Sequence, residues 1–253
     1  MRLRLRCRLQ VGRALLARPS ETTGRFAGLQ AQRLKYLLLV LLAALAAGCG
    51  SAAGAGGQAT LWVTRDRGAV VVRAVQVPAG ESAAQGLERV AKVQSRYGGR
   101  YVRAVDGVAE HGRSSWFYYV NGYLADRSAA DYRLRPGDVE WWDFRSWRDP
   151  AQDPVVVGAF PEPFLHGYDG KRRPALVVTA DPAAGHALAR LLRGRWVKPG
   201  TALPANANVL IVRSGPSRFS ARLAGQAVRM TFSGDWHRLL RGRYPFRFRY
   251  AAG

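Results

Sequence analysis

The side chains best suited to covalent catalysis form one small cluster. His111 precedes Ser114 and Ser115 by a few residues, and Glu110 lies beside it. A serine activated by a histidine is a nucleophile for acyl transfer, and a carboxylate can orient that histidine. Such clusters are also common in polar loops, and the chain has no Gly-x-Ser-x-Gly nucleophile motif. We therefore assign no catalytic residues and expect that the protein is not an enzyme.

Residues that bind metals or phosphate do not have the required spacing. The segment Gly167 to Lys171 lacks the interval of a phosphate-binding Walker loop and predicts a turn. Glu140 and Asp143 fall on one predicted strand but on opposite faces, so they do not form a carboxylate pair. We expect no metal and no cofactor. The four histidines lack the HExxH spacing of a zinc site: His111, His166, His186 and His237.

Aromatic residues are the strongest functional signal. In a predicted strand over residues 116–120, Trp116 and Tyr118 share one face, while Phe117 and Tyr119 share the other. A small sheet covered by one helix protects only one face. The second face must therefore be covered by another part of the chain, by a partner or by a ligand.

A hairpin turn follows this strand. The pair Asn121-Gly122 is typical of a two-residue turn, which places Tyr123 just beyond it. Flat rings with polar edges suit a large, partly apolar ring system. The same rings could instead form a protein core, and both interpretations stay open. The candidate ligand-binding residues are Trp116, Tyr118, Asn121 and Tyr123.

The elements around these residues predict an α+β fold. An apolar hairpin over 61–77 is followed by a helix over 82–94, with Ser82 as its cap, and then by further strands. Two strands, a helix and more strands are the order of a β-grasp domain. The later strands are expected at 101–105, 116–120 and 139–144.

Three segments of this region carry a family resemblance: residues 101–107, 115–122 and 132–142. Together they resemble the transcobalamin-like C-terminal domain, over about residues 59–147. The resemblance implies a β-grasp fold and a corrinoid such as cobalamin as a ligand in uptake. Residues 125–129 depart from the family pattern, and the large helical domain of transcobalamin has no counterpart here.

A second domain is expected after a polar linker at 148–154, which contains two prolines. Residues 155–253 predict a small α/β domain of unrecognised family. Its strands are expected at 155–160, 175–180, 208–213, 219–223 and 226–232, and its helix at 183–193.

The start of the chain predicts export. Basic residues precede twelve apolar residues, too few for a bilayer span of about 20 residues, and small residues then lead to Cys49. This order resembles the lipobox of bacterial lipoproteins. We predict a signal peptide or leader over 1–48, lipidation at Cys49 and a flexible tether over 49–58. The protein would then be lipid-anchored on the extracytoplasmic face of the cell membrane.

Charge restricts the partners. The 253 residues contain 39 Lys+Arg and 17 Asp+Glu, a net charge of +22, and arginines concentrate in the second predicted domain. Export argues against nucleic acid, so an anionic envelope surface is the expected electrostatic partner. The expected function is an exported, non-enzymatic ligand-binding lipoprotein. The alternative is an envelope adhesion or scaffold protein that uses the β-grasp face for protein contact.

The lipid anchor has a direct test. Removing residues 1–48 takes away nine basic residues and Glu21, which leaves a charge of +14 that could itself hold the protein on anionic lipid. Because salt screens that attraction, Cys49→Ala should release the protein into the medium at high salt, as measured by fractionation. Retention of the variant on membranes at high salt would show that Cys49 is not lipidated.

Overall fold

The computed structural model describes residues 56–148, 153–242 and 246–252. The predicted leader, the lipidation site Cys49, most of the tether and residues 149–152 of the linker lie outside these ranges. Among the described residues, no helix has both the length and the apolar character needed to cross a bilayer.

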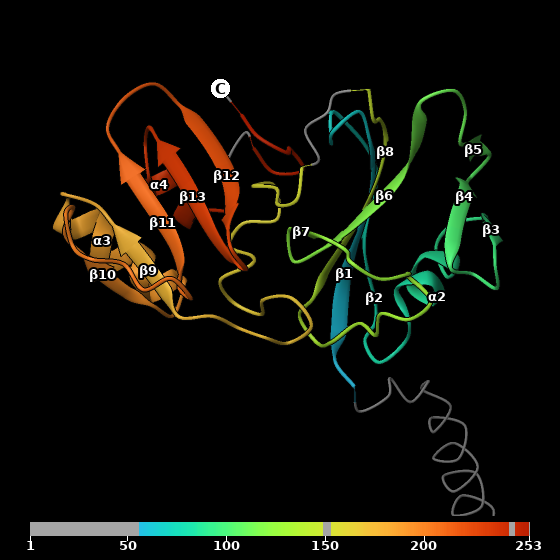
Figure 1. Ribbon diagram of the computed structural model, residues 1–253, viewed down its shortest axis with the longest axis horizontal. Helices are drawn as coiled ribbons and strands as arrows, with labels where there is room; N and C mark the ends of the chain where they lie inside the picture. The colour runs from blue at the N-terminus through green and yellow to red at the C-terminus, as the bar shows by residue number, and fades with distance from the viewer. Residues whose placement is uncertain (1–55, 149–152, 243–245, 253) are drawn as a thin grey trace, which may run out of the picture. The chain divides into compact units, whose positions relative to one another are not determined.

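The first sheet is mixed, with the strand order β2-β1-β8-β6-β7 (Figure 1). Its two central strands, β1 and β8, run parallel, and the other neighbours are antiparallel. The predicted hairpin, the strand at 116–120 and the strand at 139–144 are confirmed. The strands are β1 (Gln58–Arg65), β2 (Val70–Pro78), β6 (Ser114–Val120), β7 (Tyr123–Leu124) and β8 (Val139–Ser146).

The helix predicted over 82–94 is shorter in the structure. α2 (Ala83–Glu88) is capped by Ser82, as predicted, and the Ser82 side chain forms a capping box with Gln85. It ends early because the residues after it are drawn into a small sheet with the order β3-β4-β5. Its strands are β3 (Val93–Arg96), β4 (Tyr101–Val105) and β5 (Val108–Ala109).

Both faces of the first sheet are buried. Trp116, Trp142 and Phe144 pack with Leu87 of α2 in one core. On the opposite face, Tyr119 and Trp141 pack with Trp62, Val156, Ala159 and Tyr250. The predicted alternation along β6 and β8 is therefore confirmed, and later parts of the chain cover the second aromatic face.

A second five-stranded sheet has the order β10-β9-β11-β13-β12, with only β12 antiparallel to its neighbour. Four of its five strands and the longer of its two helices form where they were predicted. Its elements are β9 (Ala175–Val178), α3 (Pro182–Leu191), β10 (Arg195–Val197), β11 (Asn208–Arg213), β12 (Arg218–Ala224), β13 (Ala227–Ser233) and α4 (His237–Leu240).

The strand predicted over 155–160 is wrong. Only Val155 makes a β-bridge, to Tyr123. Val155 and Val157 join the core beside the second sheet, whereas Val156 and Ala159 join the core beneath the first. Residues 155–160 are apolar because this segment is buried on two sides. Periodicity alone does not distinguish such a segment from a strand.

Glu140 is one of three carboxyl residues of the first sheet and its turn that are fully buried, with Asp138 and Asp143. Glu140 is 0% exposed, and its Oε1 accepts a hydrogen bond from the Trp142 indole at 2.5 Å. Its Oε2 has no hydrogen-bond partner among the described residues. Burial away from water penalises the carboxylate, so the pKa of Glu140 lies well above its ordinary value.

This burial predicts a pH-dependent effect of Glu140→Gln. A raised pKa in the folded state means that wild-type stability falls as the pH rises above the unfolded value of about 4.3 towards the folded pKa. The glutamine carries no such penalty. The melting temperature of the variant, relative to wild type, should therefore increase between pH 4 and pH 8.

The exposed substitution Glu88→Gln is the matched control, because Glu88 makes no ion pair with a described residue. Parallel pH profiles for wild type and Glu140→Gln would contradict a buried neutral carboxyl.

Candidate functional site

A cleft of about 400 Å³ opens beside β7 and the loop that precedes β9. Both aromatic and charged side chains line it, together with short apolar ones. The lining residues are Tyr123, Leu124, Ala125, Asp126, Arg127, Pro154, Tyr168, Asp169, Lys171, Arg173, Leu223 and Gln226.

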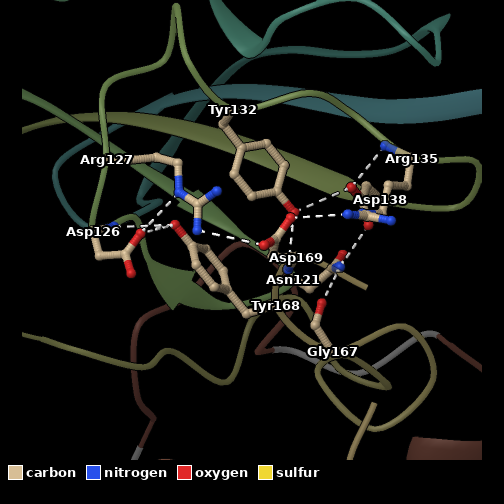
Figure 2. Close-up of polar contacts among 9 residues, drawn as sticks. All are labelled: Asn121, Asp126, Arg127, Tyr132, Arg135, Asp138, Gly167, Tyr168 and Asp169. Carbon is tan, nitrogen blue, oxygen red and sulfur yellow. Dashed lines mark hydrogen bonds and ion pairs between the residues drawn. The ribbon is translucent and has the colours of Figure 1, made fainter. Parts of the chain in front are cut away.

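The cleft wall is held by a buried amide. Asn121, 0% exposed, begins the turn between β6 and β7 with φ of 50°. Its Nδ2 donates to Asp138 Oδ1 at 2.7 Å and to the Gly167 carbonyl at 2.6 Å (Figure 2). Its Oδ1 accepts from the Val139 amide at 2.8 Å. One side chain thus connects the hairpin, the start of β8 and the loop at 167–171.

Tyr132 continues this network toward the cleft. Its hydroxyl accepts from the Asp169 amide at 3.2 Å and donates to Asp138 Oδ2 at 3.4 Å. Arg135 then donates to the Asp169 carboxylate at 2.9 Å. These bonds hold the loop that carries Asp169, and the arginine lowers the pKa of that carboxyl.

A guanidinium lies between two tyrosine rings at the rim. Arg127 is 5.7 Å from the ring centroids of both Tyr132 and Tyr168, within the range of cation–π attraction. It also pairs with Asp126 at 3.2 Å and with Asp169 at 3.5 Å. Figure 2 shows these five side chains drawn together from two separate segments of the chain.

Tyr168 is the central ring of the cleft. Its hydroxyl donates to Asp126 Oδ1 at 2.6 Å, and its ring meets that of Tyr123 edge to face at 5.9 Å. Burial, followed by the bond to Asp126, raises the pKa of Tyr168 to about 12. The hydroxyl therefore stays protonated at neutral pH and serves as a hydrogen-bond donor.

Two further cations line the cleft without a salt bridge. Neither Lys171 nor Arg173 pairs with an acidic side chain among the described residues. The acids of the cleft, Asp126 and Asp169, are already paired with Arg127 and Arg135. The cleft therefore keeps an excess of positive charge beside an aromatic wall.

The four residues predicted to bind ligand have different environments. Trp116 is 7% exposed, lies in the first core and donates from its indole to the Val108 carbonyl at 2.9 Å. Tyr118 is half-buried and stacks on Trp142 at 4.9 Å. Asn121 is buried beneath the cleft, and of the four only Tyr123 lines it. Ligand binding by these residues stays a prediction.

Sequence reasoning missed most of the cleft. Arg127 falls within 125–129, where the chain departs from the family pattern, and that departure was the available signal. Gly167 to Lys171 does form a turn, as predicted, with a backbone bond from Lys171 to Tyr168 of 2.9 Å. Nothing in the sequence indicated that this turn would lie against Tyr123.

The serine and histidine cluster does not assemble a nucleophile. His111 and Ser114 pair through their backbones, and Ser115 Oγ lies 3.1 Å from the Tyr101 hydroxyl. The described residues contain no group of three metal-ligating side chains. The cleft at Tyr123 and Tyr168 offers aromatic rings and cations to a ligand.

Residues 80–146 match the family model described as a domain of unknown function, DUF4430. This match falls inside the region that resembles the transcobalamin-like domain. None of the curated proteins matches the chain.

Two solved structures are similar over part of the chain. One is a protein of Ruminococcus gnavus ATCC 29149 for which metal binding is proposed, at 14% identity and a TM-score of 0.30, covering 36% of this chain and 97% of that one. The other is haptocorrin in complex with Cbi, at 14% identity and a TM-score of 0.31, covering 37% of this chain and 26% of that one. Likeness at this level carries no conclusion about ligands.

Burial predicts that Trp116 supports the fold. Trp116→Ala would leave a cavity and remove the indole hydrogen bond to the Val108 carbonyl, so it should lower the free energy of unfolding by about 3–5 kcal/mol in denaturant titration. Trp147→Ala is the matched control, since Trp147 is 50% exposed and should cost far less. A Trp116→Ala protein of unchanged stability would contradict the core role and favour a ligand role.

Proposed function

We propose that this protein is an exported, membrane-anchored, non-enzymatic binding module that takes its ligand in the cleft at Tyr123 and Tyr168. The observation that carries the proposal is the pairing of an aromatic wall with two cations, Lys171 and Arg173, that have no acidic partner among the described residues. Export and lipid anchoring at Cys49 rest on the sequence alone.

The chemistry of the cleft defines the ligand class. The edge-to-face rings of Tyr123 and Tyr168 favour an apolar or flat group, and the lysine and arginine favour a phosphate or carboxylate. The volume, about 400 Å³, is typical of a small-molecule site. An anionic ligand with a flat apolar part satisfies both sets of contacts.

A corrinoid is our finer proposal for that ligand. It rests on the resemblance to the transcobalamin-like domain, and the strand order with β1 and β8 parallel at the centre supports a β-grasp assignment. A whole corrinoid is larger than the cleft. The cleft would therefore hold one edge of it, with the phosphate-bearing side of cobalamin toward Lys171 and Arg173.

A second candidate function is adhesion or scaffolding through protein contact. β2 lies at the edge of its sheet, and four of its valines are more than a third exposed: Val70, Val71, Val72 and Val75. Exposed apolar edge strands are sites where another strand can add. This surface favours a protein partner and does not involve the cleft.

The cleft is tested with paired charge variants of the full chain. Lys171→Gln with Arg173→Gln should weaken cobalamin binding in calorimetric titration by about tenfold or more, because each charged hydrogen bond contributes about 1.5–3 kcal/mol. Inorganic phosphate serves as the second probe, to separate phosphate recognition from ring recognition.

The control variant carries Arg195→Gln and Lys198→Gln, which remove the same charge from exposed positions outside the cleft. Equal weakening in both variants would indicate long-range electrostatics and not a site. If the wild type shows no binding heat with cobalamin or with phosphate, the corrinoid proposal is wrong. If both variants bind cobalamin as tightly as the wild type, the site lies elsewhere.

A further inference from the structure

The second sheet carries a basic face. Arg218, Ser220 and Arg222 are every second residue of β12, so the three side chains lie on the same side of the sheet. The register pairs Arg222 with Arg229 and Arg218 with Ser233, and it pairs Ser233 with Arg213 of β11. We call this surface the arginine face. It consists of Arg213, Arg218, Ser220, Arg222, Arg229, Thr231 and Ser233.

The opposite side of the same strands is a protein core. Phe219, Met230 and Phe232 are fully buried there, beside Leu188 of α3. Figure 1 shows β11, β13 and β12 side by side, with the helices α3 and α4 near them. Because the core holds the strands in register, the arginines are presented on a rigid surface and not on a mobile loop.

The positive charge of this face is not neutralised within the described part of the chain. Arg213, Arg218 and Arg222 are exposed and form no ion pair with a described acid. Residues 172–253 contain 15 Lys+Arg and only two acids, Asp181 and Asp235. Asp235 pairs with His237 and Arg238, so it does not offset the arginine face.

One pair on the face is repulsive. Arg222 and Arg229 lie directly opposite each other on neighbouring strands, a position where like charges destabilise a sheet. Burial, and then the nearby Arg222, lowers the pKa of Arg229. Arg229 is held by donating to the carbonyls of Ala207 and Pro204. A bound anion would relieve this repulsion.

The layout of the charges is two-dimensional. With about 4.8 Å between strands and about 3.3 Å per residue, Arg213 and Arg218 are about 10 Å apart across the sheet, and Arg218 and Arg222 about 13 Å apart along it. A single phosphate chain would follow a line, whereas this spread matches a plane of phosphates. The face has no aromatic side chain on which a nucleic-acid base could stack.

We propose that the arginine face docks on the surface of a bilayer rich in anionic phospholipid. Charge complementarity carries the proposal: four arginines with no acid among them meet a plane of phosphodiester groups, and the hydroxyls of Ser220 and Thr231 can donate to the same oxygens. No large apolar side chain of the described residues is exposed on this face, so contact is made at the headgroups without insertion. The proposal does not depend on the cleft.

Arginine footprinting of the full chain tests the face. The protein is incubated with vesicles of phosphatidylglycerol and phosphatidylcholine, or of phosphatidylcholine alone, then treated with phenylglyoxal and mapped by mass spectrometry. Modification of Arg213, Arg218 and Arg222 should fall several-fold with the anionic vesicles and recover at high salt, because salt screens the contact. Footprinting reports which face lies on the membrane even if the start of the chain also binds lipid.

Three exposed arginines of the same half serve as internal controls: Arg190, Arg193 and Arg241. Their modification should not change. A triple variant Arg213→Gln, Arg218→Gln, Arg222→Gln should bind anionic vesicles more weakly than a triple variant at the three control positions, which has the same net charge.

Equal protection of both sets, no protection of either, or equal binding by the two triple variants would overturn the proposal. Protection by soluble poly(glycerol phosphate) but not by vesicles would also overturn it and assign the face to a polymer.

Discussion

The buried contact between Asn121 and Asp138 is the interaction on which the rest of the site depends. An asparagine amide removed from water must satisfy its donors and acceptor inside the protein, and here they bind a carboxylate, the Gly167 carbonyl and the Val139 amide. Losing any partner would leave a buried polar group unpaired. The Asn121 side chain therefore holds three segments together: the turn after β6, the start of β8 and the loop at 167–171.

The hydrogen-bond network of Asn121 and Asp138 extends to the cleft. Asp138 also accepts from Tyr132, whose hydroxyl holds the Asp169 amide, and Asp169 accepts from Arg135. A chain of polar contacts thus runs from a fully buried amide to a half-exposed rim. Because Asp126 and Asp169 are occupied by arginines, Lys171 and Arg173 keep their charge available for a ligand.

Burial of both faces of the first sheet is a second constraint. Trp141 and Tyr119 would be exposed if the chain ended after β8, and instead Val156, Ala159 and Tyr250 cover them. The second sheet is different. One of its faces is core, and the other carries a smaller apolar cluster on β9 and β11 beside the uncompensated arginines of β12 and β13. The unpaired positive charge of the second sheet is therefore concentrated on one of its faces.

Local chemistry in the sequence predicted the elements well. The apolar pattern identified β1, β2, β6, β8 and the strands of the second sheet other than β10. Ser82 identified the start of α2, and Asn121-Gly122 identified the hairpin, because each depends on neighbours a few residues away. The end of α2 and the segment 155–160 were mispredicted. In both, pairing or burial by distant residues overrode the local pattern.

The cleft was decided by tertiary structure alone. Its rings come from Tyr123 and Tyr168, which are 45 residues apart, and a single buried asparagine brings their segments together. The sequence determined that aromatic and basic residues are abundant. It did not determine that Trp116 lies in a core while Tyr168 lines a cleft, because the side chains that cover a ring are chosen by the packing of distant segments and not by the neighbours of that ring.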